Sequence, residues 1–143
     1  FIVFHKSRNS IVGNRIGASL KVYHNMDTLI HNQNVLKNYK VGENIKDLKY
    51  EKIPNFLQIN NQVVLFIDTN GNYNIKGLQK PILVLRQSPK INLERLIKTL
   101  NPRMIIADGS NYKSYVSLWK ASCLELHTSF WSTGEKGAYV LNN

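Results

Sequence analysis

The sequence has a single cysteine, Cys123, among its 143 residues. One thiol excludes an internal disulfide and a zinc site built from several thiolates. Long apolar runs are also missing, because the longest, Val63–Ile67, has five residues and a membrane-spanning helix needs roughly 20. We therefore expect this domain to be soluble, and its lone cysteine fits a reducing compartment.

Acidic residues are scarce as well. Nine Asp and Glu stand against 19 Lys and Arg, a formal net charge of +10. Such an excess favours polyanionic partners through counterion release, although the Asn-, Lys- and Ile-rich composition is equally explained by biased base content in the genome. The chain shows no signal peptide and its first methionine is Met26. We expect one domain, residues 1–143, excised from a larger protein.

Strands dominate the expected structure of the first half. Short apolar or alternating runs predict them at Phe1–Phe4, Ile11–Ile16, Ser19–Tyr23, Phe56–Ile59 and Val63–Ile67. A helix is predicted over residues 27–40, capped by Asp27 or Thr28 and ended by Gly42. Turns are predicted at Asn60-Asn61 and Asp68–Asn72, the second followed by a short strand at Tyr73–Ile75.

From Pro81 onward, strands and helices alternate. The predicted elements are a strand at Ile82–Leu85, a helix at Leu93–Leu100, a strand at Met104–Ala107, a helix that ends near Leu124, and two strands at Thr128–Trp131 and Ala138–Leu141. Asn92 caps the first of these helices, and Ser110 or Asn111 caps the second. Apolar strands that alternate with helices predict a mixed α/β fold with parallel strand pairs and helical cover.

Four segments of the second half carry a resemblance. They are Arg86–Leu93, Ile106–Lys113, Trp119-Lys120 and Thr133–Ala138. In this succession, residues 80–141 are similar to the C-terminal soluble domain of Bacteroidetes ComEC/Rec-family proteins, the membrane proteins of competence that internalise transforming DNA. The resemblance implies a parent protein in the inner membrane, with the membrane side of this domain left open. It also implies a metallo-β-lactamase-like αββα sandwich, here in a reduced form.

The metal-binding pattern that this resemblance leads one to seek is missing from the sequence. No HxHxDH motif occurs, and the loops over residues 86–90 and 109–113 contain no histidine. The four histidines are His5, His24, His31 and His127, and His5 and His24 would be neighbours only if Phe1–His5 pairs with Ser19–His24. We therefore expect no cofactor and no catalytic residue, with zinc or manganese held by an atypical ligand set as the alternative.

Polar residues near the expected loops are candidates for contact with phosphate. A helix that begins near Ser110 offers free N–H groups at the carboxyl edge of parallel strands, where α/β sheets bind ligands. The candidates for DNA or phosphate binding are Ser88, Lys90, Ser110, Asn111, Lys113, Lys120 and Lys136, with Asp108 as a retained site carboxylate or a turn residue. Gly134–Gly137 is expected to be a turn between strands. The S-x-x-K patterns at Ser110 and Ser117 lack the partner motifs of penicillin-recognising enzymes, so Ser117 is expected to face solvent.

Aromatic residues leave two interpretations open. Tyr112, Tyr115, Trp119 and Trp131 could stack on bases, but helical spacing places Tyr112, Tyr115, Val116, Trp119 and Cys123 on one apolar face. Three functions follow. The first is a non-catalytic accessory domain of a DNA-uptake channel that binds single-stranded DNA weakly, packing against the channel domain of the same polypeptide. The second is a metal-dependent nuclease with unusual ligands. The third is a structural module without affinity for DNA, which packs against the membrane domain or forms a homodimer.

Overall fold

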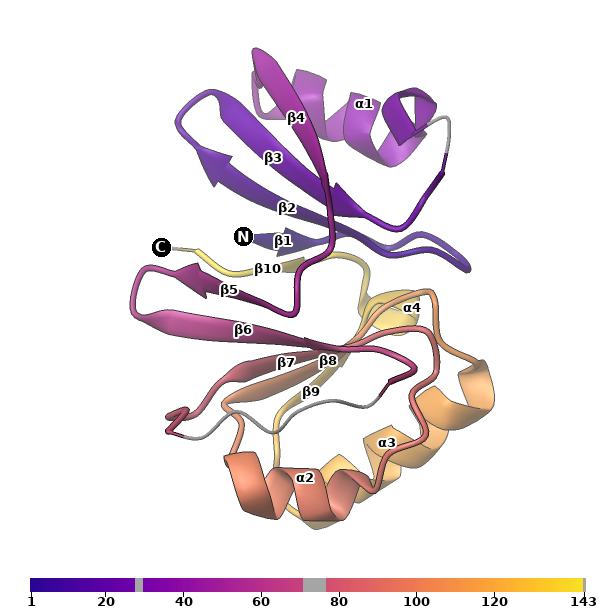
Figure 1. Cartoon of the computed structure of the whole chain (residues 1–143). Coiled ribbons are helices and arrows are strands. Elements are labelled where there is room, and N and C mark those ends of the chain that lie inside the picture. Colours follow the sequence, from indigo (N-terminus) through magenta and orange to yellow (C-terminus); the bar gives the residue numbers. More distant parts are fainter. Residues whose placement is uncertain (28–29, 71–76, 143) are drawn as a thin grey trace.

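The computed structural model describes residues 1–27, 30–70 and 77–142. In these ranges the chain forms two mixed sheets that lie face to face, with helices on the two outer faces (Figure 1). The first sheet has the strand order β10-β1-β2-β3-β4 and the second has the order β5-β6-β7-β8-β9. This layering confirms the predicted mixed α/β fold and is that of an αββα sandwich.

The first sheet is built mainly from the N-terminal third of the chain. Its strands are β1 (Ile2–Val3), β2 (Ile11–Ile16), β3 (Ser19–His24), β4 (Asp47–Lys52) and β10 (Tyr139–Val140). β1 pairs antiparallel with β2 and β10, β2 pairs antiparallel with β3, and β3 pairs parallel with β4. Because β2 separates β1 from β3, the pairing of Phe1–His5 with Ser19–His24 that would make His5 and His24 neighbours does not form.

The second sheet carries the parallel strands. Its members are β5 (Phe56–Ile59), β6 (Gln62–Ile67), β7 (Ile82–Leu85), β8 (Met104–Ala107) and β9 (Phe130–Ser132). The β5–β6 hairpin turns at Asn60-Asn61, as predicted, and β6 to β9 run parallel to one another. The predicted strand at Tyr73–Ile75 and the second half of its turn lie outside the described residues.

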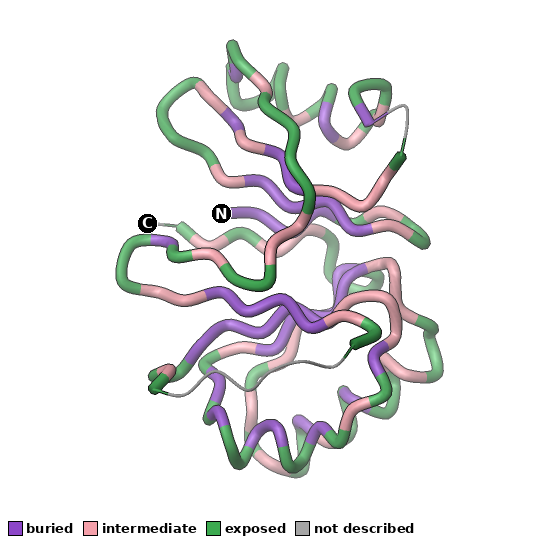
Figure 2. The backbone as a smooth tube through the Cα atoms, viewed as in Figure 1, coloured by how far each residue is buried: buried purple, intermediate pink, exposed green. Residues whose placement is uncertain are grey.

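Three apolar layers hold the sandwich together, and the period of two along the strands sorts residues between them. Along β7, Ile82 and Val84 face the first sheet, while Leu83 and Leu85 face the helices. The layer between the sheets also receives Phe1 and Val3, and the inner strands of both sheets accordingly form the buried centre of the molecule (Figure 2). Ile2, Phe4 and Leu36 belong to the third layer, under α1.

The helices are α1 (Asn34–Gly42), preceded by a 3-10 turn at Ile30–Asn32, and α2 (Leu93–Leu100), α3 (Lys113–Glu125) and α4 (Thr133–Lys136). Asn92 caps α2 as predicted, since its side chain accepts a bond from the Arg95 N–H. The first helix instead begins after Gln33, so Asp27 does not cap it, and Thr28 is outside the described residues. None of the helices in the described ranges has the length and apolar character needed to cross a bilayer.

Candidate functional site

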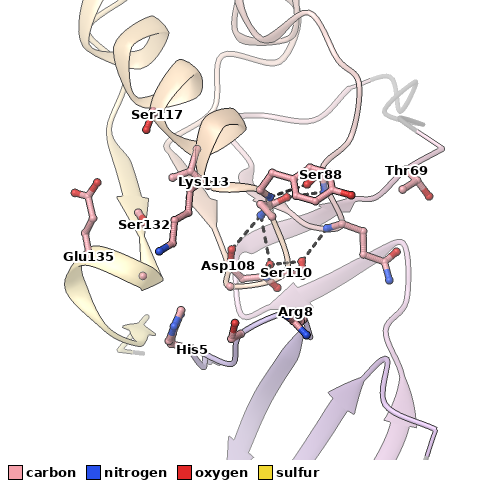
Figure 3. A pocket seen from close by; sticks show the side chains of 17 residues that line it. His5, Arg8, Thr69, Ser88, Asp108, Ser110, Lys113, Ser117, Ser132 and Glu135 are labelled. Carbon is pink, nitrogen blue, oxygen red and sulfur yellow. Dashed lines mark hydrogen bonds between the residues drawn. The ribbon is translucent and has the colours of Figure 1, made fainter.

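A cleft lies where the parallel strands of the second sheet end. The loops that follow β6, β7, β8 and β9 meet at one edge of the sheet, as the carboxyl ends of parallel strands do. The segment between β1 and β2 of the first sheet closes the cleft from the other side (Figure 3). The cleft has a volume of about 1270 Å³, which is large enough for a drug-sized ligand.

Asp108 sits at the floor of this cleft, directly after β8. Its side chain is 2% exposed, and its Oδ1 accepts bonds from the backbone N–H and the hydroxyl of Ser110. Burial raises the pKa of Asp108, while the nearby hydroxyls of Ser10 and Ser110 and the charge of Arg86 act in the opposite direction. Among the described residues, no group bonds to its Oδ2. Asp108 thus bonds within its own turn, as the turn interpretation predicted.

The loops after β7 and β8 are locked to each other by four hydrogen bonds. Ser88 N–H donates to Asn111 Oδ1 (2.8 Å), and Asn111 Nδ2 donates to the Leu85 carbonyl (2.7 Å). Gln87 N–H donates to Ser110 Oγ, and Tyr112 N–H to Ser88 Oγ, both at 2.8 Å. Gln87 and Ser88 have positive φ angles of 58° and 50°, a conformation that these bonds help to hold.

This network corrects the predicted start of the second helix. α3 begins at Lys113 with Tyr112 as its N-cap residue, and no side chain caps it. Ser110 and Asn111 do not cap, because their polar atoms are used by the loop after β7. Gly134–Gly137 also differs from the prediction: residues Thr133–Lys136 form the one-turn helix α4, which leads from β9 of the second sheet to β10 of the first.

Three residues of the β1–β2 segment join the site, although no sequence pattern indicates it. Arg8 N–H donates to the Gly109 carbonyl at 2.9 Å. His5 Nδ1 lies 3.0 Å from Thr133 Oγ1, and the hydroxyl of Ser10 donates to that of Ser110. Since these contacts join opposite sheets of the sandwich, no local sequence signal could have found them.

The basic candidates are dispersed. Lys113 and Arg8 line the cleft, and Lys113 extends from α3 toward His5 (Figure 3). Within the described ranges neither forms an ion pair, whereas Lys120 pairs with Glu135 at 2.9 Å. Lys136 lies over the Trp131 ring, 5.2 Å from its centroid. Lys90 is exposed and does not line the cleft, so the structure brings together Ser88, Ser110, Asn111 and Lys113 but not Lys90, Lys120 or Lys136.

The aromatic residues divide between core and surface. Trp119 is 3% exposed, and Tyr115 packs beside it, as helical spacing predicted. Tyr112 is 68% exposed at the cleft, so its predicted place on the apolar face is wrong. The Trp131 indole N–H donates to the Gly137 carbonyl, and Ser117 is exposed as expected.

The residues that the structure describes do not fit a metal centre. Across the described ranges, no three His, Cys, Asp or Glu side chains converge as metal ligands would. At the cleft, Asp108 Oδ1 is occupied by Ser110 and Glu135 Oε2 is 2.9 Å from Lys120 Nζ. A tetrahedral zinc site needs three or four converging protein ligands, and the described residues of the cleft do not supply them.

The family model of the ComEC C-terminal domain matches residues 1–143, the full length of the sequence. No curated protein and no solved structure matches the chain.

Proposed function

The chain belongs to the family of ComEC C-terminal domains, which implies a role in DNA uptake, and we propose that it is a non-catalytic accessory domain of the uptake channel. In this proposal the cleft makes weak, nonspecific contact with the phosphates of single-stranded DNA, next to the channel domain of the same polypeptide. The observation that carries the proposal is the pattern of charge pairing. Of the charged residues lining the cleft, Arg8 and Lys113 have no acidic partner in the described ranges, whereas Glu135 is paired with Lys120.

Two further features support phosphate contact at this place. Lys113 is the first residue of α3, a helix of 13 residues, and the N-terminus of a helix carries a partial positive charge that favours anions. The exposed ring of Tyr112 lies beside it, and base–aromatic stacking is tolerant of sequence. A phosphate near Lys113 and a base on Tyr112 are therefore compatible with binding that does not read sequence.

The serine-lysine pairs support a role without catalysis. A nucleophilic serine needs a nearby base that can take its proton. The hydroxyl of Ser110 donates to Asp108 and not to Lys113, and the Lys120 amine, three residues after Ser117, is engaged by Glu135. In neither pair is the lysine placed as the base of its serine.

The test is a titration of the 143-residue chain with a fluorescent single-stranded oligonucleotide over a salt series, with and without chelator. We expect an affinity that falls steeply with salt, ignores chelator and is similar for unrelated sequences, because phosphate contacts release counterions. Absence of binding at low salt would remove the proposal in favour of the structural module. Binding or cleavage that depends on a divalent metal would favour the nuclease.

A further inference from the structure

Strand β4 forms a free edge of the first sheet. It lies last in the order β10-β1-β2-β3-β4, and in the described part of the chain no other strand pairs with it. All its residues except Leu48 are exposed. A free edge presents unpaired N–H and C=O groups, to which another strand can add.

The direction of these groups follows from the pairing with β3. The Ala18 carbonyl accepts from the N–H groups of both Lys46 (2.8 Å) and Asp47 (3.3 Å). The bond from Asp47 is the one that agrees with the pairing on the other edge of β3, so the backbone groups of Asp47 point toward β3. Because the direction alternates along a strand, Lys49 and Glu51 also bond to β3, while Leu48, Tyr50 and Lys52 point their backbone groups outward. The pairing of β3 with β2 gives the same direction. The N–H of Asn25, just after β3, donates to the carbonyl of Ser10, just before β2, so the odd-numbered residues of β3 bond to β2. The even-numbered residues of β3 are then the ones that bond to β4.

From these observations we propose that two copies of the chain associate through their β4 strands, antiparallel and centred on Tyr50. In this register Tyr50 lies opposite Tyr50 of the second copy, and Leu48 lies opposite Lys52. All the outward N–H and C=O groups of these three residues then find partners, and the first sheets of the two copies become one continuous sheet. The arrangement is a closed two-fold dimer, in which each copy offers the same surface.

Charge favours this register over the two next to it. With Tyr50 at the centre, Lys49 lies opposite Glu51 of the second copy, twice by symmetry, in the positions where side chains approach most closely. A shift of the partner strand that keeps outward groups facing each other moves the centre to Lys49 or to Glu51. The first shift sets Lys49 against Lys49, and the second sets Glu51 against Glu51.

The side chains that would pair are accessible. Lys49, Tyr50 and Glu51 are all exposed, and the bond of Glu51 to Lys21 (3.0 Å) joins two half-exposed groups at the surface, which leaves the carboxylate free to meet a second amine. Charged residues on an edge strand normally discourage pairing. Here their alternating sign discourages the two registers on either side of the one centred on Tyr50.

The charge pattern gives a complementation test by light scattering coupled to size exclusion, over a wide range of protein concentration. We expect wild type to pass from monomer to dimer as concentration rises, and Lys49→Glu and Glu51→Lys each to stay monomeric, because each sets like charges opposite each other. Mixing the two variants should restore a dimer, since every opposed pair is then Glu with Lys. Lys46→Glu, an equal change of charge just outside the strand, should dimerise like wild type.

A backbone variant tests the direction of the groups. Tyr50→Pro removes an N–H that points away from β3, and proline is tolerated on an edge strand in that orientation. We expect it to keep a wild-type circular dichroism spectrum and to lose the dimer. The proposal is overturned if wild type stays monomeric throughout, if Lys49→Glu dimerises as wild type does, or if the mixed variants fail to associate. None of these outcomes bears on DNA binding by the cleft.

Discussion

Ser10 and Ser110, 100 positions apart in the chain, share a hydrogen bond of 3.2 Å at the floor of the cleft. Ser10 directly precedes β2 of the first sheet and is fully buried, while Ser110 follows β8 of the second. The hydroxyl of Ser110 in turn donates to Asp108. The floor of the cleft is therefore a polar seam between two sheets that otherwise meet through apolar side chains.

The seam should contribute to stability. Ser10→Ala removes one buried hydrogen bond, which we expect to lower the free energy of unfolding by about 1 kcal/mol. Urea unfolding followed by circular dichroism measures this value. Ser114→Ala, on the exposed face of α3, is the control and should change it by less than about 0.5 kcal/mol. Equal effects of the two substitutions would contradict a structural role for the seam.

Asp108 should make stability depend on pH. Burial raises the pKa of this carboxyl in the folded protein above its ordinary value of 3.8, so the folded state binds more protons than the unfolded state between the two pKa values. The contribution of Asp108 to stability is therefore present below pH 3.8 and is lost as pH rises through the folded pKa.

Comparison of wild type with Asp108→Asn isolates this contribution. Asparagine keeps an oxygen that can accept from Ser110 but carries no titrating proton. We expect the fall in unfolding free energy with rising pH to be smaller in Asp108→Asn than in wild type. Parallel pH profiles for the two proteins would show that Asp108 titrates normally.

Much of the fold follows from local pattern, and the α2 region shows why. Leu93, Leu96, Ile97 and Leu100 recur at helical spacing after the cap residue Asn92, and four consecutive apolar residues in β7 indicate a strand buried on both faces. Both elements have the predicted bounds. α1 begins seven residues later than expected, at Asn34 rather than residue 27, because its short apolar pattern leaves the start undetermined.

Less of the candidate site could be predicted from local sequence pattern. Ser110 has the residue type and the position of a helix cap. Its other role is visible only in the loop after β7, where the Gln87 N–H donates to its hydroxyl oxygen. His5 and Arg8 reach the cleft because the two sheets stack, a relation between distant parts of the chain that no local period encodes. Charge alone also could not separate Lys113 from Lys90.

Gly109 should be intolerant of any side chain. A Cβ atom there would lie 2.4 Å from the Lys6 carbonyl oxygen, a backbone atom held by the neighbouring bond from Arg8 N–H to the Gly109 carbonyl. We expect Gly109→Ala to cost about 1–3 kcal/mol of unfolding free energy and to weaken DNA binding by deforming the cleft. Gly42→Ala is the control, because nothing lies within 4 Å of its Cβ position. A thermal melt in which the two variants match would contradict the close approach.

Tyr112 should act through its ring and not its hydroxyl. If a base stacks on this exposed side chain, Tyr112→Ala loses about 1–3 kcal/mol of binding free energy for single-stranded DNA, while Tyr112→Phe retains wild-type affinity. Fluorescence anisotropy at one fixed salt concentration compares the three proteins. Loss of binding in the Phe variant, or its retention in the Ala variant, would remove stacking from the mechanism.

Lys113 and Lys90 offer the sharpest contrast at the cleft, since both are exposed lysines in or beside adjoining loops and only Lys113 lines the cleft. Lys113→Gln and Lys90→Gln lower the net charge of the protein equally. If the long-range field alone attracts DNA, the two variants should lose the same affinity. A phosphate contact at Lys113 instead predicts that Lys113→Gln alone loses affinity, and that its plot of log affinity against log salt has a slope shallower by about 0.7.

The affinity of each variant, measured across a salt series in which counterion release dominates, gives this slope. Equal slopes for Lys113→Gln and Lys90→Gln would mean that the cleft does not hold the phosphate, even if both bind more weakly than wild type.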